Sequence, residues 1–197
     1  MLSDMHMNIA HKVFETIQSE LKVRINYEKF RYGSIAPDIN PVLMFNSHSL
    51  ASSIDFIHRS MEHMTDTGLI TDKLNIKKFS FNLGMVIHFI SDYFCKAHND
   101  QKYKNIIIHY LYEKRLEKFF NGIKNDCDIF GGLPRNGVWR LETSLKEYIC
   151  CKHTEYCMTN RTMDHDIHFA VGVSSVVALN IVQRVLENGK NKLLKTA

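Results

Sequence analysis

Apolar residues recur along this chain at steps of three and four, which is the spacing of one face of an α-helix. In the first such segment, 4–23, the apolar positions are Ile9, Val13, Ile17 and Leu21. Further segments with this pattern cover residues 49–64, 72–97, 103–123, 139–157 and 164–187. No run of any length alternates apolar and polar residues as a half-buried β-strand would. The sequence therefore predicts an all-α fold, an antiparallel helical bundle.

Segments rich in turn-forming residues separate these predicted helices. The longest, 26–47, contains Pro37 and Pro41, which disfavour helix around them. Its hydrophobic residues favour order over disorder, so we predict an extended ordered loop here. Shorter breaks are predicted at 66–71, 99–100 and 125–137.

Composition limits the classes of protein to consider. A chain of 197 residues with 45% apolar residues is long enough for one globular domain over residues 1–197. The net charge of +4 is not concentrated in a basic block, which makes nucleic acid a less favoured partner. The apolar stretch 168–183 is shorter than the ~20 residues of a membrane span, so no transmembrane segment is predicted and a buried helix is preferred.

The cysteines and the N-terminus bear on location. The five cysteines are odd in number and two are adjacent, which is a poor disulfide framework and indicates a reducing compartment. The opening stretch MLSDMHMNIAHKVFETI lacks the basic and apolar regions of a secretory signal. We therefore expect a cytoplasmic protein, with a secreted mature form whose signal has been removed as the alternative.

Metal-binding residue types gather between Phe81 and Phe120. They are His88, Asp92, His98, His109 and Glu113, in the pattern H-x3-D-x5-H-x10-H-x3-E. Residues four apart share a helix face, so the members of each His-carboxylate pair can point at one place. Either pair alone is equally well explained by a surface hydrogen bond.

The apolar neighbours of both pairs favour a metal. His88 lies within an apolar helix, and a buried Asp92 without a partner would cost several kcal/mol. Imidazole nitrogens and carboxylate oxygens without thiolates form the ligand set expected of a hydrolytic zinc site.

Other clusters are interpreted as structural. Cys150, His153 and Cys157 fall near one helix face, but no second half of a zinc site is found, so half-buried cysteines are preferred. Cys95 is interpreted as a bystander. We interpret Asp164, Asp166 and the histidines beside them as solvated or capping residues of a helix N-terminus.

The ordered motifs resemble a known family. The stretch FNLGMVIHFISDYFCKAHND followed by HYLYEKRLEKFF resembles the zinc-dependent phospholipase C family of bacteria. The segments YGSIAPDINPVLMFNSHSL and DMHMNIAHKVFETI resemble two earlier motifs of that family. The resemblance covers residues 5–120 in order, and it implies an all-α domain with a polynuclear zinc centre.

Carried over by position, the resemblance implies two or three Zn²⁺ ions per chain. The first site would be held by Asp38, His48, His88 and Asp92. The second would be held by His98, His109 and Glu113. The third would be held by His6, with Asp92 as a bridge.

The chain departs from the family at two places. The family completes its third zinc site with an N-terminal tryptophan, whereas this sequence begins with Met1 and places His6 five residues later. Many relatives carry Q-P-x-H before the second histidine, where this chain has Cys95, Lys96 and Ala97 ahead of His98.

The resemblance implies hydrolysis of a phospholipid or another phosphodiester. Bound zinc would activate a water, and Asp38 would orient or deprotonate that water as the catalytic residue. Peripheral contact with a membrane is consistent with such a substrate. The alternatives are a zinc-dependent nuclease or nucleotidase, and a non-catalytic metal-binding protein on the same scaffold.

Overall fold

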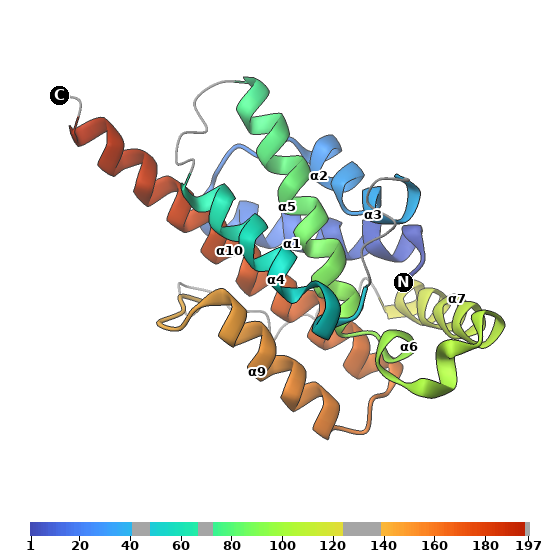
Figure 1. Cartoon of the computed structure of the whole chain (residues 1–197). Coiled ribbons are helices and arrows are strands. Elements are labelled where there is room, and N and C mark those ends of the chain that lie inside the picture. Colours follow the sequence, from blue (N-terminus) through green and yellow to red (C-terminus); the bar gives the residue numbers. More distant parts are fainter. Residues whose placement is uncertain (41–47, 67–72, 124–138, 196–197) are drawn as a thin grey trace.

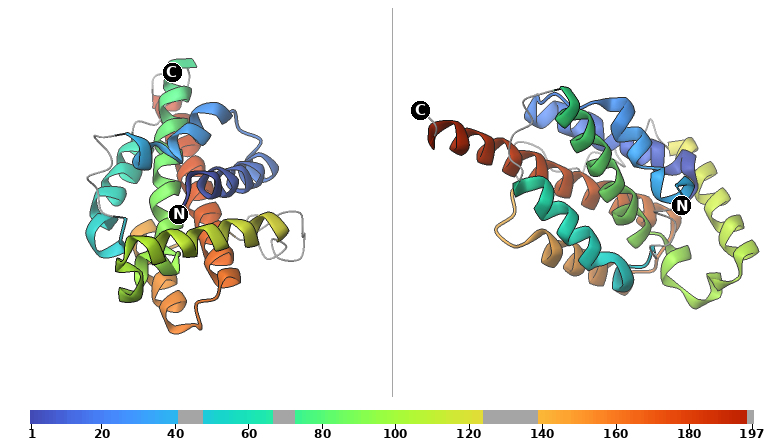
Figure 2. Two further views of the ribbon diagram at one scale, coloured as in Figure 1. Left: turned by 90° about the vertical axis from the view of Figure 1, so that its right-hand side faces the viewer. Right: turned by 45° about the horizontal axis from the view of Figure 1, so that its top comes forward.

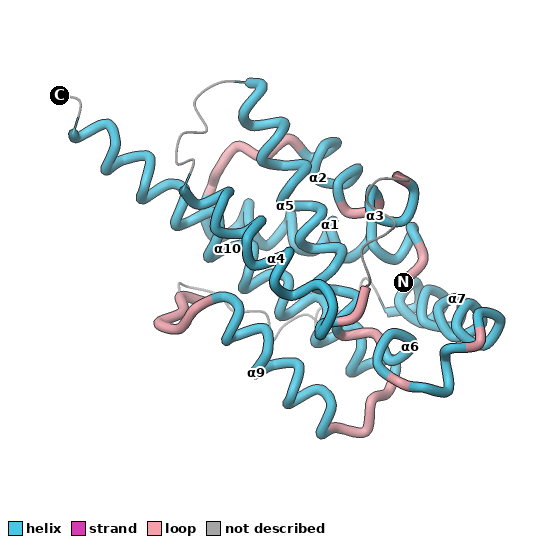
Figure 3. The backbone as a smooth tube through the Cα atoms, viewed as in Figure 1, coloured by secondary structure: helices cyan, strands magenta, loops and turns pink. Residues whose placement is uncertain are grey.

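The computed structural model describes residues 1–40, 48–66, 73–123 and 139–195, and helix is the regular structure throughout them. Figure 3 shows the helices joined by short loops. The larger helices are α1 (Ser3–Leu21), α4 (Leu50–Asp66), α5 (Lys73–Tyr93), α7 (Ile106–Ile123), α9 (Leu145–Met158) and α10 (Met163–Lys195). The shorter ones are α2 (Tyr27–Gly33), α3 (Ala36–Ile39), α6 (Lys96–Asn99) and the 3₁₀ helix η1 (Gln101–Lys104). The prediction of an all-α fold is confirmed.

Helix α5 lies at the centre of the bundle and packs against α2, α4 and α10 (Figure 1). Its buried side chains include Leu83, Val86 and Ile90. At its crossing with α2, a Cβ atom added to Gly84 would collide with the carbonyl oxygen of Phe30. The two backbones therefore approach more closely than any larger residue would allow.

Helix α10 forms the second half of the core and packs against α1, α4 and α5. Its stretch 163–189 is the one described segment that is long and apolar enough to cross a membrane, and 72% of the tested window is buried inside the protein. A buried core helix has the same length and composition, so this stretch is weak evidence for a membrane span. Asn180 ties the helix to the segment before α9, because its side-chain amide donates to the carbonyl oxygen of Trp139.

The predicted extended loop at 26–47 is wrong where the structure describes it. Residues 27–33 and 36–39 are helical, and residues 41–47 lie outside the described part. The Asn26 side chain accepts a hydrogen bond from the Lys29 amide and caps α2. Pro37 falls in the first turn of α3, where its missing N–H group costs nothing.

The predicted helix at 72–97 ends earlier, at Tyr93, and α6 follows. The backbone amide of Lys96 donates to Asp166 Oδ2 on α10, which anchors the start of α6. Asp166 is fully buried and also accepts from the hydroxyl groups of Tyr112 and Tyr156. Its interpretation as a solvated or capping residue is therefore wrong: this carboxylate holds α6, α7 and α9 onto α10.

The remaining boundaries move by several residues. The helix predicted at 139–157 begins at Leu145, because Ser144 and Glu147 form a reciprocal capping box there. The predicted breaks at 66–71 and 125–137 lie almost entirely outside the described residues. Figure 2 shows α7 lying across one end of the bundle, next to the N-terminus.

Candidate metal centre

The central helix α5 carries His88 and Asp92 to the end of the bundle that α7 covers (Figure 1). Both side chains are fully buried, and His88 Nε2 lies 3.4 Å from Asp92 Oδ2. On α7, His109 Nε2 lies 2.7 Å from Glu113 Oε1. Both pairs predicted from four-residue spacing are therefore formed.

The first predicted ligand set comes together in space. His48 Nδ1 lies 2.7 Å from Asp92 Oδ2 and 3.3 Å from His88 Nε2. Asp38 Oδ1 lies 3.6 Å from His88 Nε2 and 3.8 Å from His48 Nδ1. Ligands about 2.0–2.1 Å from a tetrahedral zinc ion are about 3.3 Å from one another. Small side-chain adjustments would therefore close these four residues around one ion.

The second predicted set is equally close. His98 Nε2 lies 3.3 Å from Glu113 Oε1, and the rings of His98 and His109 meet edge to face with centroids 4.8 Å apart. The set also adjoins the first, because His98 Nε2 is 3.3 Å from Asp92 Oδ1. Asp92 thus faces both groups, one with each oxygen.

His6 is fixed so that an unprotonated nitrogen points into the centre. The Ser91 hydroxyl donates to the carbonyl oxygen of His88, so its oxygen accepts from His6 Nδ1, 3.0 Å away. In the neutral ring the proton then resides on Nδ1, and Nε2 presents a lone pair. This buried Nε2 has no hydrogen-bond partner, and it lies 3.4 Å from Asp92 Oδ1 and 3.8 Å from Asp38 Oδ2.

His88 is held in the same way. Its Nδ1 donates to the carbonyl oxygen of Ser34 at 2.9 Å, which leaves the lone pair of Nε2 directed at Asp38 and Asp92. A second hydrogen bond that fixes the tautomer is the usual support of a metal-binding histidine. The rings of His6 and His88 are stacked with centroids 3.9 Å apart. Two lone pairs facing carboxylates across a buried space repel those carboxylates unless a cation lies between them.

The α-amino group of Met1 is a further member of the centre. It lies 2.6 Å from Asp92 Oδ1, 3.0 Å from Glu113 Oε1 and 3.1 Å from His98 Nε2. Burial opposes its charge, but the two carboxylates outweigh burial and raise the pKa of this amino group to about 12. For the third site the resemblance implied His6 with Asp92 as a bridge, and the structure brings the Met1 nitrogen beside that Asp92. An ammonium group takes a cation's place here, and it would become a metal donor only after losing a proton.

The charges of the centre suit metal ligands. Burial opposes ionisation of Asp92, but His98 and the Met1 ammonium group hold the pKa of its carboxyl well below the ordinary value. Burial holds the pKa of His88 well below its ordinary value, so its imidazole is neutral at pH 7. The pKa of Asp38 is raised, chiefly by burial and secondly by the nearby Asp92.

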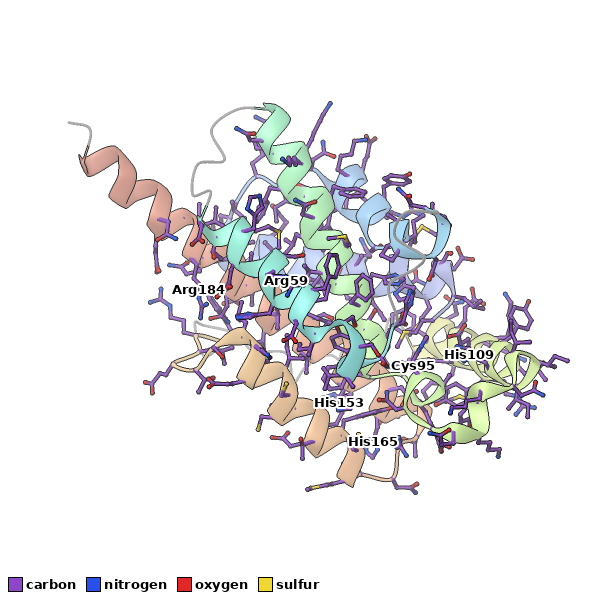
Figure 4. All side chains as sticks on the ribbon, viewed as in Figure 1. Arg59, Cys95, His109, His153, His165 and Arg184 are labelled. Carbon is purple, nitrogen blue, oxygen red and sulfur yellow. The ribbon has the colours of Figure 1, made fainter. Side chains whose placement is uncertain are left out.

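Cys95 lies closer to the centre than its interpretation as a bystander suggested. Its Sγ atom lies within 4.8 Å of the ligand atoms of His98 and Glu113, at the end of α5 (Figure 4). Burial raises the pKa of this thiol well above its ordinary value, so the thiol is uncharged at neutral pH. His153 Nε2 is hydrogen-bonded to Asn99 Oδ1, and Cys157 belongs to none of the described groups of metal-binding side chains.

A cleft of about 530 Å³ opens onto the centre. His48, His98 and His109 form part of its lining, so at least one histidine of each of the first two predicted sets faces the space where a substrate would enter. Tyr103 and Lys104 of η1 line it as well.

All eight residues predicted as ligands therefore meet at one end of the bundle. Seven of them come from α1, α3, α5, α6 and α7, and His48 lies two residues before α4. Residues 5–167 match a protein-family model described as zinc dependent phospholipase C. No curated protein and no solved structure matched the chain in the corresponding searches.

Proposed function

Because this chain belongs to the zinc-dependent phospholipase C family, we propose that it hydrolyses a phosphodiester bond of a phospholipid or a similar compound at this centre. The observation that carries the proposal is the paired orientation of His6 and His88. Each donates its Nδ1 proton to a neighbouring oxygen and turns an Nε2 lone pair toward buried carboxylates. Such a space is suited to cations and not to a hydrogen-bonded core.

We assign the ligands in the sets that the structure brings together. Asp38, His48, His88 and Asp92 would hold one Zn²⁺, and His98, His109 and Glu113 a second. A third would lie beside His6, shared through Asp92. Bound zinc would supply an acidified water near neutral pH and positive charge for the phosphoryl oxygens.

The two aspartates of the centre differ in exposure. Asp38 is partly exposed, whereas Asp92 is fully buried, so Asp38 is the carboxylate better able to reach a water at the edge of the centre. In the metal-free protein burial raises the pKa of this carboxyl above its ordinary value. We propose that Asp38 orients the attacking water and accepts its proton.

The residues that line the cleft distinguish between the candidate substrates. Lys104 provides a positive charge near the entrance, and Tyr103 is the one aromatic residue other than histidine among the described residues of the lining. Single-stranded nucleic acid is usually bound through several stacking aromatics along a basic groove. The lining of this cleft therefore favours a phospholipid over a nucleic acid substrate.

The proposal is tested by metal content and activity together. Protein stripped with a chelator and reloaded with zinc is assayed against a chromogenic phosphodiester and a short-chain phospholipid, and its zinc is counted by mass spectrometry. We expect at least two zinc ions per chain and zinc-dependent hydrolysis, both lost in His88→Ala. His11→Ala is the matched control, because His11 is an exposed histidine paired with Glu15.

Two outcomes would contradict the proposal. Fewer than two zinc ions per chain, with no hydrolysis after reloading, would contradict the proposed phosphodiesterase activity. Full zinc content without hydrolysis of either substrate would favour a non-catalytic metal-binding protein on this scaffold.

A further inference from the structure

Helix α7 has two opposed faces with different chemistry. His109, Glu113, Leu116 and Phe120, at steps of four, three and four, face the protein; the last three are buried and the His109 ring contacts that of His98. Residues 107, 111, 114 and 118 have the same spacing on the opposite face. That outward face is exposed at every one of these positions.

The N-terminal half of the outward side is apolar. Ile106 is 81% exposed and Ile107 is 66% exposed, and Tyr110 and Leu111 lie one turn further along, about half exposed. We call these four residues the α7 patch. Exposed large apolar side chains are common singly, but a contiguous group on one helix marks a surface that binds something apolar.

The exposed charged side chains of η1 and α7 are all basic. Between residues 101 and 119 the exposed charged side chains are Lys102, Lys104, Lys114, Arg115 and Lys118. The acidic residues of this stretch are Glu113, which is buried in the centre, and Glu117, which is largely covered and pairs with Lys114. A helix with exposed apolar residues and a basic surround has the features of one that lies in a lipid-water interface.

The position of the α7 patch relates it to the cleft. Lys104 lines the cleft and lies two residues before Ile106, and His109 lies between Ile108 and Tyr110. Figure 2 shows α7 on the outside of the bundle, across the end where the centre lies. A surface that receives the α7 patch would therefore adjoin the entrance of the cleft.

We propose that the α7 patch docks the protein on an anionic lipid surface. The apolar side chains enter the interface, and the lysines and the arginine beside them meet the negative head groups. The benefit of such docking to a lipid-cleaving enzyme rests on the function proposed above, whereas the docking itself can be measured without catalysis.

The test is vesicle flotation of the zinc-loaded protein, briefly and in the cold, with vesicles of phosphatidylcholine alone or with added phosphatidylglycerol. We expect stronger binding to the phosphatidylglycerol vesicles, and weaker binding as salt rises. The double variant Ile106→Ser with Ile107→Ser should bind those vesicles at least about tenfold more weakly. Met158→Ser is the matched control, because Met158 is 82% exposed at the end of α9, on a different helix.

Hydrolysis of a soluble chromogenic phosphodiester separates the two proposals. The Ile106 and Ile107 double variant should retain that hydrolysis while losing vesicle binding. If wild-type protein does not bind the vesicles, or if the double variant still binds them, the proposed docking surface is refuted. A wild-type dimer that the double variant converts to a monomer would overturn it as well, because a second copy would then cover the patch. Vesicle binding without any phosphodiesterase activity would leave the docking surface standing and refute the proposed function.

Discussion

Asp92→Asn is the substitution that probes the centre most directly. The change removes one negative charge and keeps nearly the same shape. It leaves the buried Met1 ammonium group, now 2.6 Å from Asp92 Oδ1, with Glu113 as its remaining carboxylate neighbour. Removing one partner of a buried ion pair costs about 3–5 kcal/mol, and the surviving Glu113 contact places the expectation near the lower limit. We therefore expect the metal-free variant to be about 3 kcal/mol less stable than metal-free wild type at pH 7.

The measurement is urea unfolding of both proteins in the presence of a chelator. Asp55→Asn is the control, because Asp55 is an exposed carboxylate whose ion pair with Lys146 should matter little. The pKa of Asp92 is depressed in the folded state, so its contribution is complete above the ordinary aspartate pKa and is lost as pH falls through the folded value. The difference between wild type and Asp92→Asn should therefore shrink as the pH is lowered below about 4.

The same variant should bind less zinc, because an amide cannot serve two cations as a bridging carboxylate can. Equal stability of the two metal-free proteins at pH 7, together with equal zinc content, would refute the argument. Asp92 would then be a buried carboxylate whose contacts carry little energy, and the centre would not depend on it.

Three further predictions concern the surroundings of the centre. Gly84→Ala should lower the free energy of unfolding by about 1–3 kcal/mol, because the added Cβ collides with the Phe30 carbonyl. Gly172→Ala should be neutral or stabilising, because a Cβ there meets nothing within 4 Å, and urea unfolding of both variants tests the difference. Metal-free protein should lose stability as pH rises from 8 toward 12, because the stabilisation from the charged Met1 amino group is complete below its ordinary pKa of 8.0 and is lost as pH rises toward the folded value of about 12. The loss should be smaller in Asp92→Asn, and equal slopes of unfolding free energy against pH in the two proteins would contradict this. In native protein an alkylating agent should label the exposed Cys151 quickly and the buried Cys95 only on unfolding, as peptide mapping will show.

Local patterns predicted the parts of the centre that lie on single helices. The four-residue spacing of His88 with Asp92, and of His109 with Glu113, is a property of the helix itself, so it could be read without the fold. The inclusion of His6, Asp38 and His48 came from the resemblance to a family, because no spacing along the chain connects those residues to α5.

The errors fell where distant residues decide the local structure. Nothing between Asp92 and His98 has the composition of a helix end, yet α5 ends at Tyr93 and α6 starts where Asp166 accepts the Lys96 amide. That cap comes from α10, so the sequence around it could not reveal the break. The same applies to Met1, whose role depends on α1 lying against α5 and α7.

The charge balance of the described centre explains why these residues belong to a metal site and not to an ordinary core. Three carboxylates, from Asp38, Asp92 and Glu113, meet there, and the positive charge beside them comes from the Met1 ammonium group and from His98, whose pKa is raised, against the effect of burial, by Asp92 and Glu113. Protonating His6 or His88 at Nε2 could add positive charge, but burial opposes an imidazolium at His88. A divalent ion between the Nε2 atoms and the carboxylates would remove the excess negative charge and use the lone pairs at once. The folded chain therefore gains from zinc a charge compensation that protonation of the buried His88 would supply only against the cost of burial.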